Sequence, residues 1–307
     1  MKPIVLFTIL FLVGCQTRYK SAMKKFEEGE YQKAIEAFKQ IAQSAKNDAE
    51  VARANFMIGE SYRVSNRPLE AIPFFEAALQ KSYNSNDIKF YYAYALKMKG
   101  DYAKASEIFQ QYVTEGTNPD LIFRAQEEIK NLAALHLIKE NEYIKLTNCA
   151  TINTEGSEYS PFYYENKLIY TGERKGGAVY QANGAFFTDL FMVSWKETDS
   201  CTNQVPQPFF EKLNLDGFHE ASVAFSKDGK MMVFARSNSG NKKDENRDVN
   251  LYMCRKDKNG VWSEPELMSI NSLTAWDACP AFSADGNTLY FASNRPGGFG
   301  GIDLYTV

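Results

Sequence analysis

The sequence predicts an α+β protein with two domains, a helical-repeat domain followed by an all-β domain. Glycine carries the first indication, because only five of the 19 glycines precede residue 146. Glycine disfavours helix interiors and is frequent in the turns between short strands. The second indication is a recurrent alanine and aromatic spacing before residue 116, and the third is a recurrent Asp-Gly turn after residue 220. We place the domain boundary near Asn141–Lys145.

The first residues have the pattern of an export signal. Lys2 precedes an apolar run from Pro3 to Val13, and Leu12-Val13-Gly14-Cys15 follows directly. Eleven residues are too few to span a bilayer core, which needs about 20. The four residues Leu12–Cys15 resemble the lipobox of bacterial lipoproteins. This resemblance implies a signal peptide over residues 1–14 and lipidation of Cys15. Gln16 and Thr17, by the same resemblance, favour the periplasmic face of the outer membrane. The alternative is an ordinary signal peptide with an accidental cysteine.

A repeat occupies the helical half. Gly29-Glu30-Tyr31, Asn66-Arg67-Pro68 and Gly100-Asp101-Tyr102 are each followed by an alanine and, four residues later, by a phenylalanine. Successive alanines stand 37 and 34 residues apart, and a small residue stands seven positions before each turn. This pattern resembles three tetratricopeptide repeats. The resemblance implies an α-solenoid domain over residues 15–140, closed by a capping helix over Leu121–Lys139. Amphipathic helices of an ordinary bundle are the alternative.

In such an array the first helices of the repeats line a concave groove that binds peptides. The repeat register predicts that five residues face it: Phe56, Arg63, Phe90, Tyr94 and Lys97. An aromatic stripe of this kind also serves as a contact with a neighbouring domain, so that alternative stays open.

Three similar units make up the second half. Ser160-Pro161-Phe162, Val223-Ala224-Phe225-Ser226 and Pro280-Ala281-Phe282-Ser283 open them, and two further strands follow each opening. The turns are Glu165-Asn166 in the first unit, Asp228-Gly229 in the second and Asp285-Gly286 in the third. Asp-Gly between alternating runs is a strong hairpin signal. Trp262–Leu267 is expected to add an outer strand to the second unit.

The third unit, Asp277–Tyr305, resembles the WD40-like repeat of TolB-type β-propellers. The resemblance implies a partial propeller of three blades over residues 146–307, with a β-sandwich as the rival fold. Three blades do not close a ring, for which four to eight are usual. We therefore expect the natural chain to continue beyond Val307.

The composition and the motifs argue against several kinds of binding site. The net charge of −3 provides no basic surplus for nucleic acid. With two histidines and no Cys-x-x-Cys, we expect no metal and no cofactor. Gly297–Gly301 lacks the Lys-Ser/Thr of a phosphate loop. Asp189, Asp248 and Asp303 are too dispersed for one calcium loop and are expected to form local turn hydrogen bonds.

Apart from Cys15, four cysteines remain: Cys149, Cys201, Cys254 and Cys279. In an oxidising compartment an even set allows disulfides in three connectivities. Buried free thiols are the alternative.

The combination of signal, helical repeats and propeller resembles outer-membrane lipoproteins that end in an OmpA-like peptidoglycan-binding domain, one class of which anchors the type IX secretion machine. The resemblance implies a non-enzymatic, lipid-anchored scaffold that binds protein partners in the cell envelope, with peptidoglycan bound only through a domain outside this chain. The alternative is the recognition part of an exported propeller-type serine peptidase. No Gly-x-Ser-x-Gly motif is present.

Overall fold

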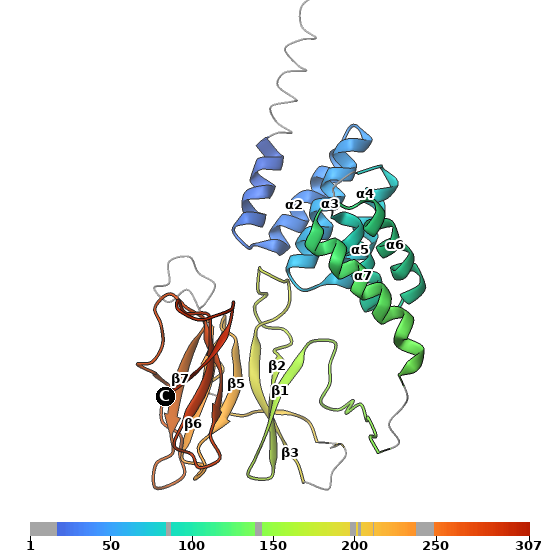
Figure 1. Ribbon diagram of the computed structural model, residues 1–307. Coiled ribbons are helices and arrows are strands. Elements are labelled where there is room, and N and C mark those ends of the chain that lie inside the picture. Colours follow the sequence, from blue (N-terminus) through green and yellow to red (C-terminus); the bar gives the residue numbers. More distant parts are fainter. Residues whose placement is uncertain are drawn as a thin grey trace, which may run out of the picture. The chain divides into compact units, whose positions relative to one another are not determined.

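The computed structural model describes residues 17–83, 87–138, 143–196, 201, 204–210, 212–237 and 249–307 (Figure 1). Two compact units divide the chain. The first contains the residues up to Ile144 together with Gln181–Gly184, and the second contains the remainder. The signal peptide and Cys15 predicted from the sequence lie outside the described residues.

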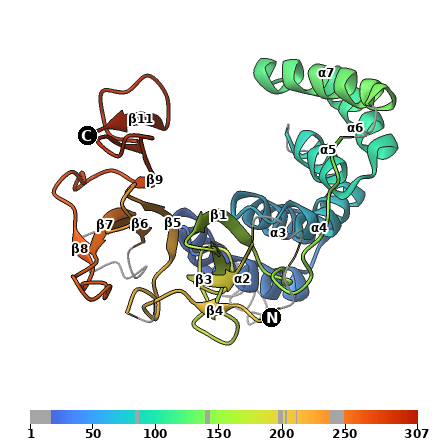
Figure 2. The ribbon, with the colours of Figure 1, turned by 90° about the horizontal axis from the view of Figure 1, so that it is seen from below.

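Antiparallel helices, each packed on the next in the chain, form the first unit (Figures 1 and 2). Residues 17–27 are helical. The helices that follow are α2 (Tyr31–Ser44), α3 (Asp48–Val64), α4 (Pro68–Gln80), α5 (Ile88–Lys99), α6 (Tyr102–Glu115) and α7 (Pro119–Ala134), and α7 continues into the short helix η1 (Leu135–Leu137). Asn47 and Asn118 accept backbone hydrogen bonds at the starts of α3 and α7. Gly100 ends α5 with a φ of 90°, which glycine adopts at little cost.

The alanines of the repeat lie in the core of the helical unit. Ala34, Ala71 and Ala105 are completely buried. Gly59, from the matching small-residue position, faces Phe75, and a Cβ added there would lie 2.6 Å from the ring. The small side chains thus let α3 and α4 pack at a distance that the phenylalanine fills.

The capping helix is shorter than the sequence predicts. α7 ends at Ala134, five residues before Lys139, and turns into η1. It buries Leu121 and Ala125 against the preceding helices and leaves Phe123 exposed. One face of α7 therefore completes the helical core while the other is free of the array.

The second unit contains three antiparallel sheets. Sheet 1 consists of β1 (Glu158–Tyr164), β2 (Lys167–Glu173), β3 (Thr188–Ser194) and β4 (Gln207–Pro208); sheet 2 of β5 (Glu220–Phe225), β6 (Met231–Arg236), β7 (Asn250–Arg255) and β8 (Glu266–Leu267); and sheet 3 of β9 (Asp277–Phe282), β10 (Leu289–Ser293) and β11 (Asp303–Thr306). Each sheet pairs its strands in chain order. The outer strand predicted for the second unit is confirmed by β8.

The hairpin turns of sheets 2 and 3 have the same internal hydrogen bonds. Asp228 accepts from the Ser226 hydroxyl and from the backbone N–H of Lys230. Asp285 likewise accepts from Ser283 and from the N–H of Asn287. In sheet 1 both Glu165 and Asn166 have positive φ, 47° and 58°, which gives the right-handed strand twist without glycine. The sequence-predicted hairpins are confirmed by these turns.

Each first strand contains a bulge at the same place. Ser160, Ser222 and Cys279 have φ angles of 50°, 50° and 53°, and the strand pairing shifts beside each of them. Ser160 and Ser222 bring their hydroxyl oxygens within 3.2 Å of one another. The bulges therefore repeat a local geometry that the turn motifs alone did not predict.

The sheets bury apolar residues between neighbours, with sheet 2 in contact with both of the others (Figure 2). Tyr164 of sheet 1 stacks on Phe225 of sheet 2 at a ring-centre distance of 3.9 Å. Val233 and Leu251 of sheet 2 share a cluster with Phe291 of sheet 3. Over the described residues the three sheets do not close into a ring, so the architecture established here is a set of stacked antiparallel sheets.

We predict that Ala71→Leu destabilises the helical unit by about 1 to 3 kcal/mol, because a larger side chain overpacks the contact between helices. Thermal unfolding of the full chain, followed by circular dichroism at the helical minimum, measures the effect. Ala103→Leu is the matched control, since Ala103 is exposed on α6. Equal melting temperatures for the two variants would contradict the close packing at Ala71.

Candidate functional site

Four of the five predicted groove residues are partly accessible. Phe56, Arg63, Tyr94 and Lys97 have intermediate exposure on α3 and α5. Phe56 stacks on Tyr83 at 4.8 Å. The four side chains thus keep an accessible edge while part of each packs on the unit.

The prediction that Phe90 faces the groove is wrong. Phe90 is 1% exposed and lies in the core, with ring centres 5.6 Å from both Phe109 and Tyr112. Its neighbour Tyr91 is partly exposed instead. One residue along a helix rotates the side chain by about 100°, so a register error of one position exchanges a core residue for a surface residue.

Contacts between side chains connect the first helices of successive repeats. The guanidinium of Arg53 lies 4.0 Å from the ring centre of Tyr19, which joins the helix of residues 17–27 to α3. Arg63 lies 3.9 Å from the ring centre of Tyr91, which joins α3 to α5. Lys97 of α5 forms an ion pair of 2.7 Å with Glu128 of α7.

We define the first-helix surface as the partly or fully exposed residues of these helices that make or adjoin the contacts: Tyr19, Arg53, Phe56, Glu60, Arg63, Tyr91, Tyr94 and Lys97. Glu60 receives two hydrogen bonds from Arg63, at 2.8 and 2.7 Å. The carboxylates of Glu60 and Glu128 offset the charges of Arg63 and Lys97. Aromatic rings with balanced charge are suited to packing against a peptide.

The residues that the sequence reasoning missed share one property. The contacts of Tyr19 with Arg53 and of Tyr91 with Arg63 form only when helices from different repeats pack together. The repeat register places residues along one helix, whereas these contacts depend on the stacking of one repeat on the next.

Buried ion pairs between an acid and an arginine characterise the sheet unit. In sheet 2, Nε of Arg236 lies 2.7 Å from Oε1 of Glu220, which is completely buried. In sheet 1, Arg174 pairs with Asp189 through two contacts of 2.5 Å. Burial raises the pKa of Glu220 to about 7, and Arg236 opposes that rise.

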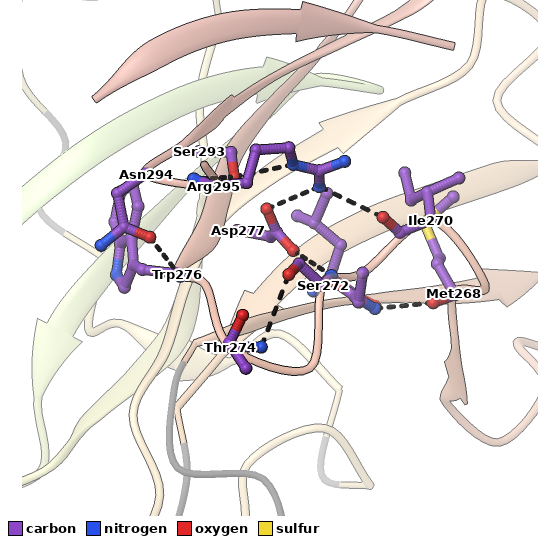
Figure 3. Close-up of polar contacts among 11 residues, drawn as sticks. Met268, Ile270, Ser272, Thr274, Trp276, Asp277, Ser293, Asn294 and Arg295 are labelled. Atoms are coloured by element: carbon purple, nitrogen blue, oxygen red, sulfur yellow. Dashed lines mark hydrogen bonds and ion pairs between the residues drawn. The ribbon is translucent and has the colours of Figure 1, made fainter. Parts of the chain in front are cut away.

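Figure 3 shows the corresponding network in sheet 3. Asp277, completely buried, accepts from Nη2 of Arg295 at 2.8 Å and from the backbone N–H of Ser272 at 2.7 Å. Arg295 also donates to the carbonyl of Ile270 at 3.2 Å. These bonds fix the segment that leads into β9 against the end of β10. Asp277 and Arg295 bond to each other and to backbone groups of neighbouring segments, so we interpret the network as structural.

His219 is partly buried among aromatic rings. Its ring centre lies 4.7 Å from that of Tyr180 and 4.6 Å from that of Phe187, and its Nδ1 accepts from the N–H of Thr188 at 3.2 Å. Burial lowers the pKa of His219 to about 4, since the imidazolium loses its hydration. His219 is therefore neutral near pH 7.

The cysteines divide between the two alternatives left open by the sequence. Cys149 and Cys201 form a disulfide, while Cys254 and Cys279 are free thiols. Cys254 is buried, and burial raises its pKa to about 12. A thiol of that pKa is not a nucleophile near neutral pH.

The dispersed aspartates serve local contacts. Asp189 binds Arg174, and Asp303 accepts from the N–H of Gly300 at 3.1 Å, whereas Asp248 lies outside the described residues. Within the described ranges, no group of three or more histidines, cysteines or acids is arranged to hold a metal ion. Nor does that part of the chain contain a helix with the length and apolar character needed to cross a membrane.

Comparison with known proteins finds a family match in the first part of the helical unit. Residues 19–86 match the tetratricopeptide repeat family. The translocator chaperone SycD of Yersinia enterocolitica type III secretion is 16% identical, with 40% of this chain and 86% of SycD covered at a TM-score of 0.35. PcrH from Pseudomonas aeruginosa is 17% identical, with coverage of 39% and 92% and a TM-score of 0.34. No curated protein matched the chain. Residues 19–86 of the helical unit thus contain tetratricopeptide repeats.

We predict that His219 makes the sheet unit less stable in acid. A histidine whose folded pKa is lowered stabilises the fold above its unfolded pKa of about 6.5, and this contribution of about 3 kcal/mol is lost as the pH falls toward 4. Denaturant unfolding between pH 7 and 4 should show that the stability difference between wild type and His219→Gln shrinks over this range. His136→Gln, at an exposed position, is the control. Parallel pH curves for wild type and His219→Gln would contradict the assignment.

Proposed function

We propose that the protein is a non-enzymatic adaptor that binds a protein partner through its tetratricopeptide repeats. The first-helix surface is the observation that carries this proposal, because it extends over successive repeats and combines accessible aromatic rings with paired charges. Helical repeats present such surfaces to extended or helical peptides. The proposal requires no cofactor and no nucleic acid.

The location we propose is the periplasmic face of the bacterial outer membrane, with the protein held by acyl chains on Cys15. The sequence Leu12-Val13-Gly14-Cys15 supports this, since it follows an apolar run and resembles a lipobox. Several acyl chains anchor a protein stably, whereas one chain gives only reversible binding. The Cys149–Cys201 disulfide is consistent with an oxidising compartment.

We further propose that the three sheets are blades of a WD40-like propeller, and that the adaptor works in a secretion or cell-envelope anchoring complex. The support is the recurrence of the same bulge in all three sheets, and of the same turn and the same acid–arginine pairing in sheets 2 and 3. Repetition of one small unit is typical of propellers.

We expect a photo-crosslinking amino acid at position 94 to capture a discrete partner in intact cells, since Tyr94 is a partly accessible part of the first-helix surface. The same amino acid at Ala103, which is exposed on α6, is the control. Adding Arg63→Ala to the position 94 variant should weaken the adduct. If positions 94 and 103 gave the same adducts, the first-helix surface would not be the binding surface.

For the anchor, we expect labelled palmitate to enter the chain when the precursor is expressed in a bacterial host. Cys15→Ala should abolish the label, because the thiol is the attachment atom, whereas Cys279→Ala, which removes an exposed thiol, should retain it. Labelling is followed by gel autoradiography. Persistent label in Cys15→Ala would refute the lipobox.

A further inference from the structure

A second surface of the helical unit has a different chemistry from the first-helix surface. A pocket of about 360 Å³ opens between the helix of residues 17–27 and α2. We name it the basic pocket, and its lining residues are Arg18, Ser21, Lys25, Ala37, Gln40, Ile41 and Ser44. Nothing that the adaptor proposal uses lies in it.

The two helices place hydrogen-bond donors on both walls. Arg18, Ser21 and Lys25 are spaced three and four residues apart, so they share one face of their helix. Gln40 and Ser44 lie one turn apart on α2 and face them across the pocket. The Ser44 hydroxyl already donates to the carbonyl oxygens of Gln40 and Ile41, at 2.9 and 3.3 Å. Arg18, Ser21, Lys25 and Gln40 are therefore the groups left to donate to a ligand.

The charge of the pocket is positive and uncompensated. None of the lining residues is acidic. Arg18 and Lys25 form no ion pair with any residue that the structure describes, whereas Arg63 and Lys97 of the first-helix surface are paired with Glu60 and Glu128. Arginine and lysine two turns apart on one helix face, with hydroxyl and amide donors from the same pocket, match the oxygens of a phosphate group. Ile41 forms an apolar wall beside them.

We propose that the basic pocket binds the phosphate group of a small phosphate ester, either free or as the headgroup of an anionic phospholipid. The proposal stands without the lipid anchor. If Cys15 is acylated, however, the three residues to Arg18 span at most about 10 Å, so the pocket lies within reach of the headgroup layer. Near such a surface each basic residue contributes about 1 kcal/mol of attraction.

The test uses the full chain in a Cys15→Ala background, so that no acyl chain contributes to binding. Glycerol 3-phosphate is titrated by calorimetry, and flotation is measured with vesicles of phosphatidylcholine with or without phosphatidylglycerol. Arg18→Gln/Lys25→Gln should weaken binding by about tenfold or more, as expected for loss of charge-assisted hydrogen bonds. Lys20→Gln/Lys24→Gln is the matched control, because these lysines are exposed on the same helix and outside the pocket.

The pattern of results distinguishes the two sources of phosphate. If Arg18→Gln/Lys25→Gln weakens only the binding of glycerol 3-phosphate, the ligand is a free ester. If the same variant weakens flotation with phosphatidylglycerol vesicles, the ligand is a lipid headgroup. Equal losses in the two double variants would mean that only net charge matters, which overturns the pocket. Absence of binding to either probe overturns it as well. Lys25→Gln alone repeats the comparison if the double variant loses its helical circular dichroism.

Discussion

Within each half of the chain, every helix pair or small sheet must bury an apolar face against the next one. The rest of this protein depends on that constraint. A pair of helices or a small antiparallel sheet leaves an apolar face in water unless a neighbour covers it. In the helical unit the cover requires small residues, since a Cβ on Gly59 would meet Phe75 at 2.6 Å. In the sheet unit aromatic stacking has the same effect, as between Tyr164 and Phe225. Both halves are therefore stabilised by contacts between neighbouring repeats.

The two units use polar chemistry in opposite ways. The sheets direct it inward, where Glu220 and Asp277 are completely buried and bound to Arg236 and Arg295. Such pairs secure the geometry of the segments they join, because removing one partner leaves a buried charge. The helices keep their charged side chains at the surface, where they remain available to a partner or a ligand.

Two surfaces of the helical unit consequently differ in what they can bind. The first-helix surface combines aromatic rings with cations that are already paired, as Arg63 is with Glu60. This combination favours a peptide over a small anion, because the acids oppose a second negative charge. The basic pocket has the reverse character, with Arg18 and Lys25 and no acid in its lining. An adaptor with both surfaces would contact a protein and a phosphate-bearing ligand through separate residues.

The sequence by itself determined the features that rest on local rules. The alanine spacing, the order of strands and the Asp-Gly turns follow from periodicity and turn chemistry. As these rules predict, Ala71 is buried in the helical core and Gly229 has a positive φ in its turn. The tertiary structure alone decided that Phe90 is buried in place of Tyr91, that Cys149 pairs with Cys201, and that Arg18 and Gln40 share a pocket. These outcomes depend on how separate elements approach one another in space, and spacing along a single helix or strand carries no information about that distance.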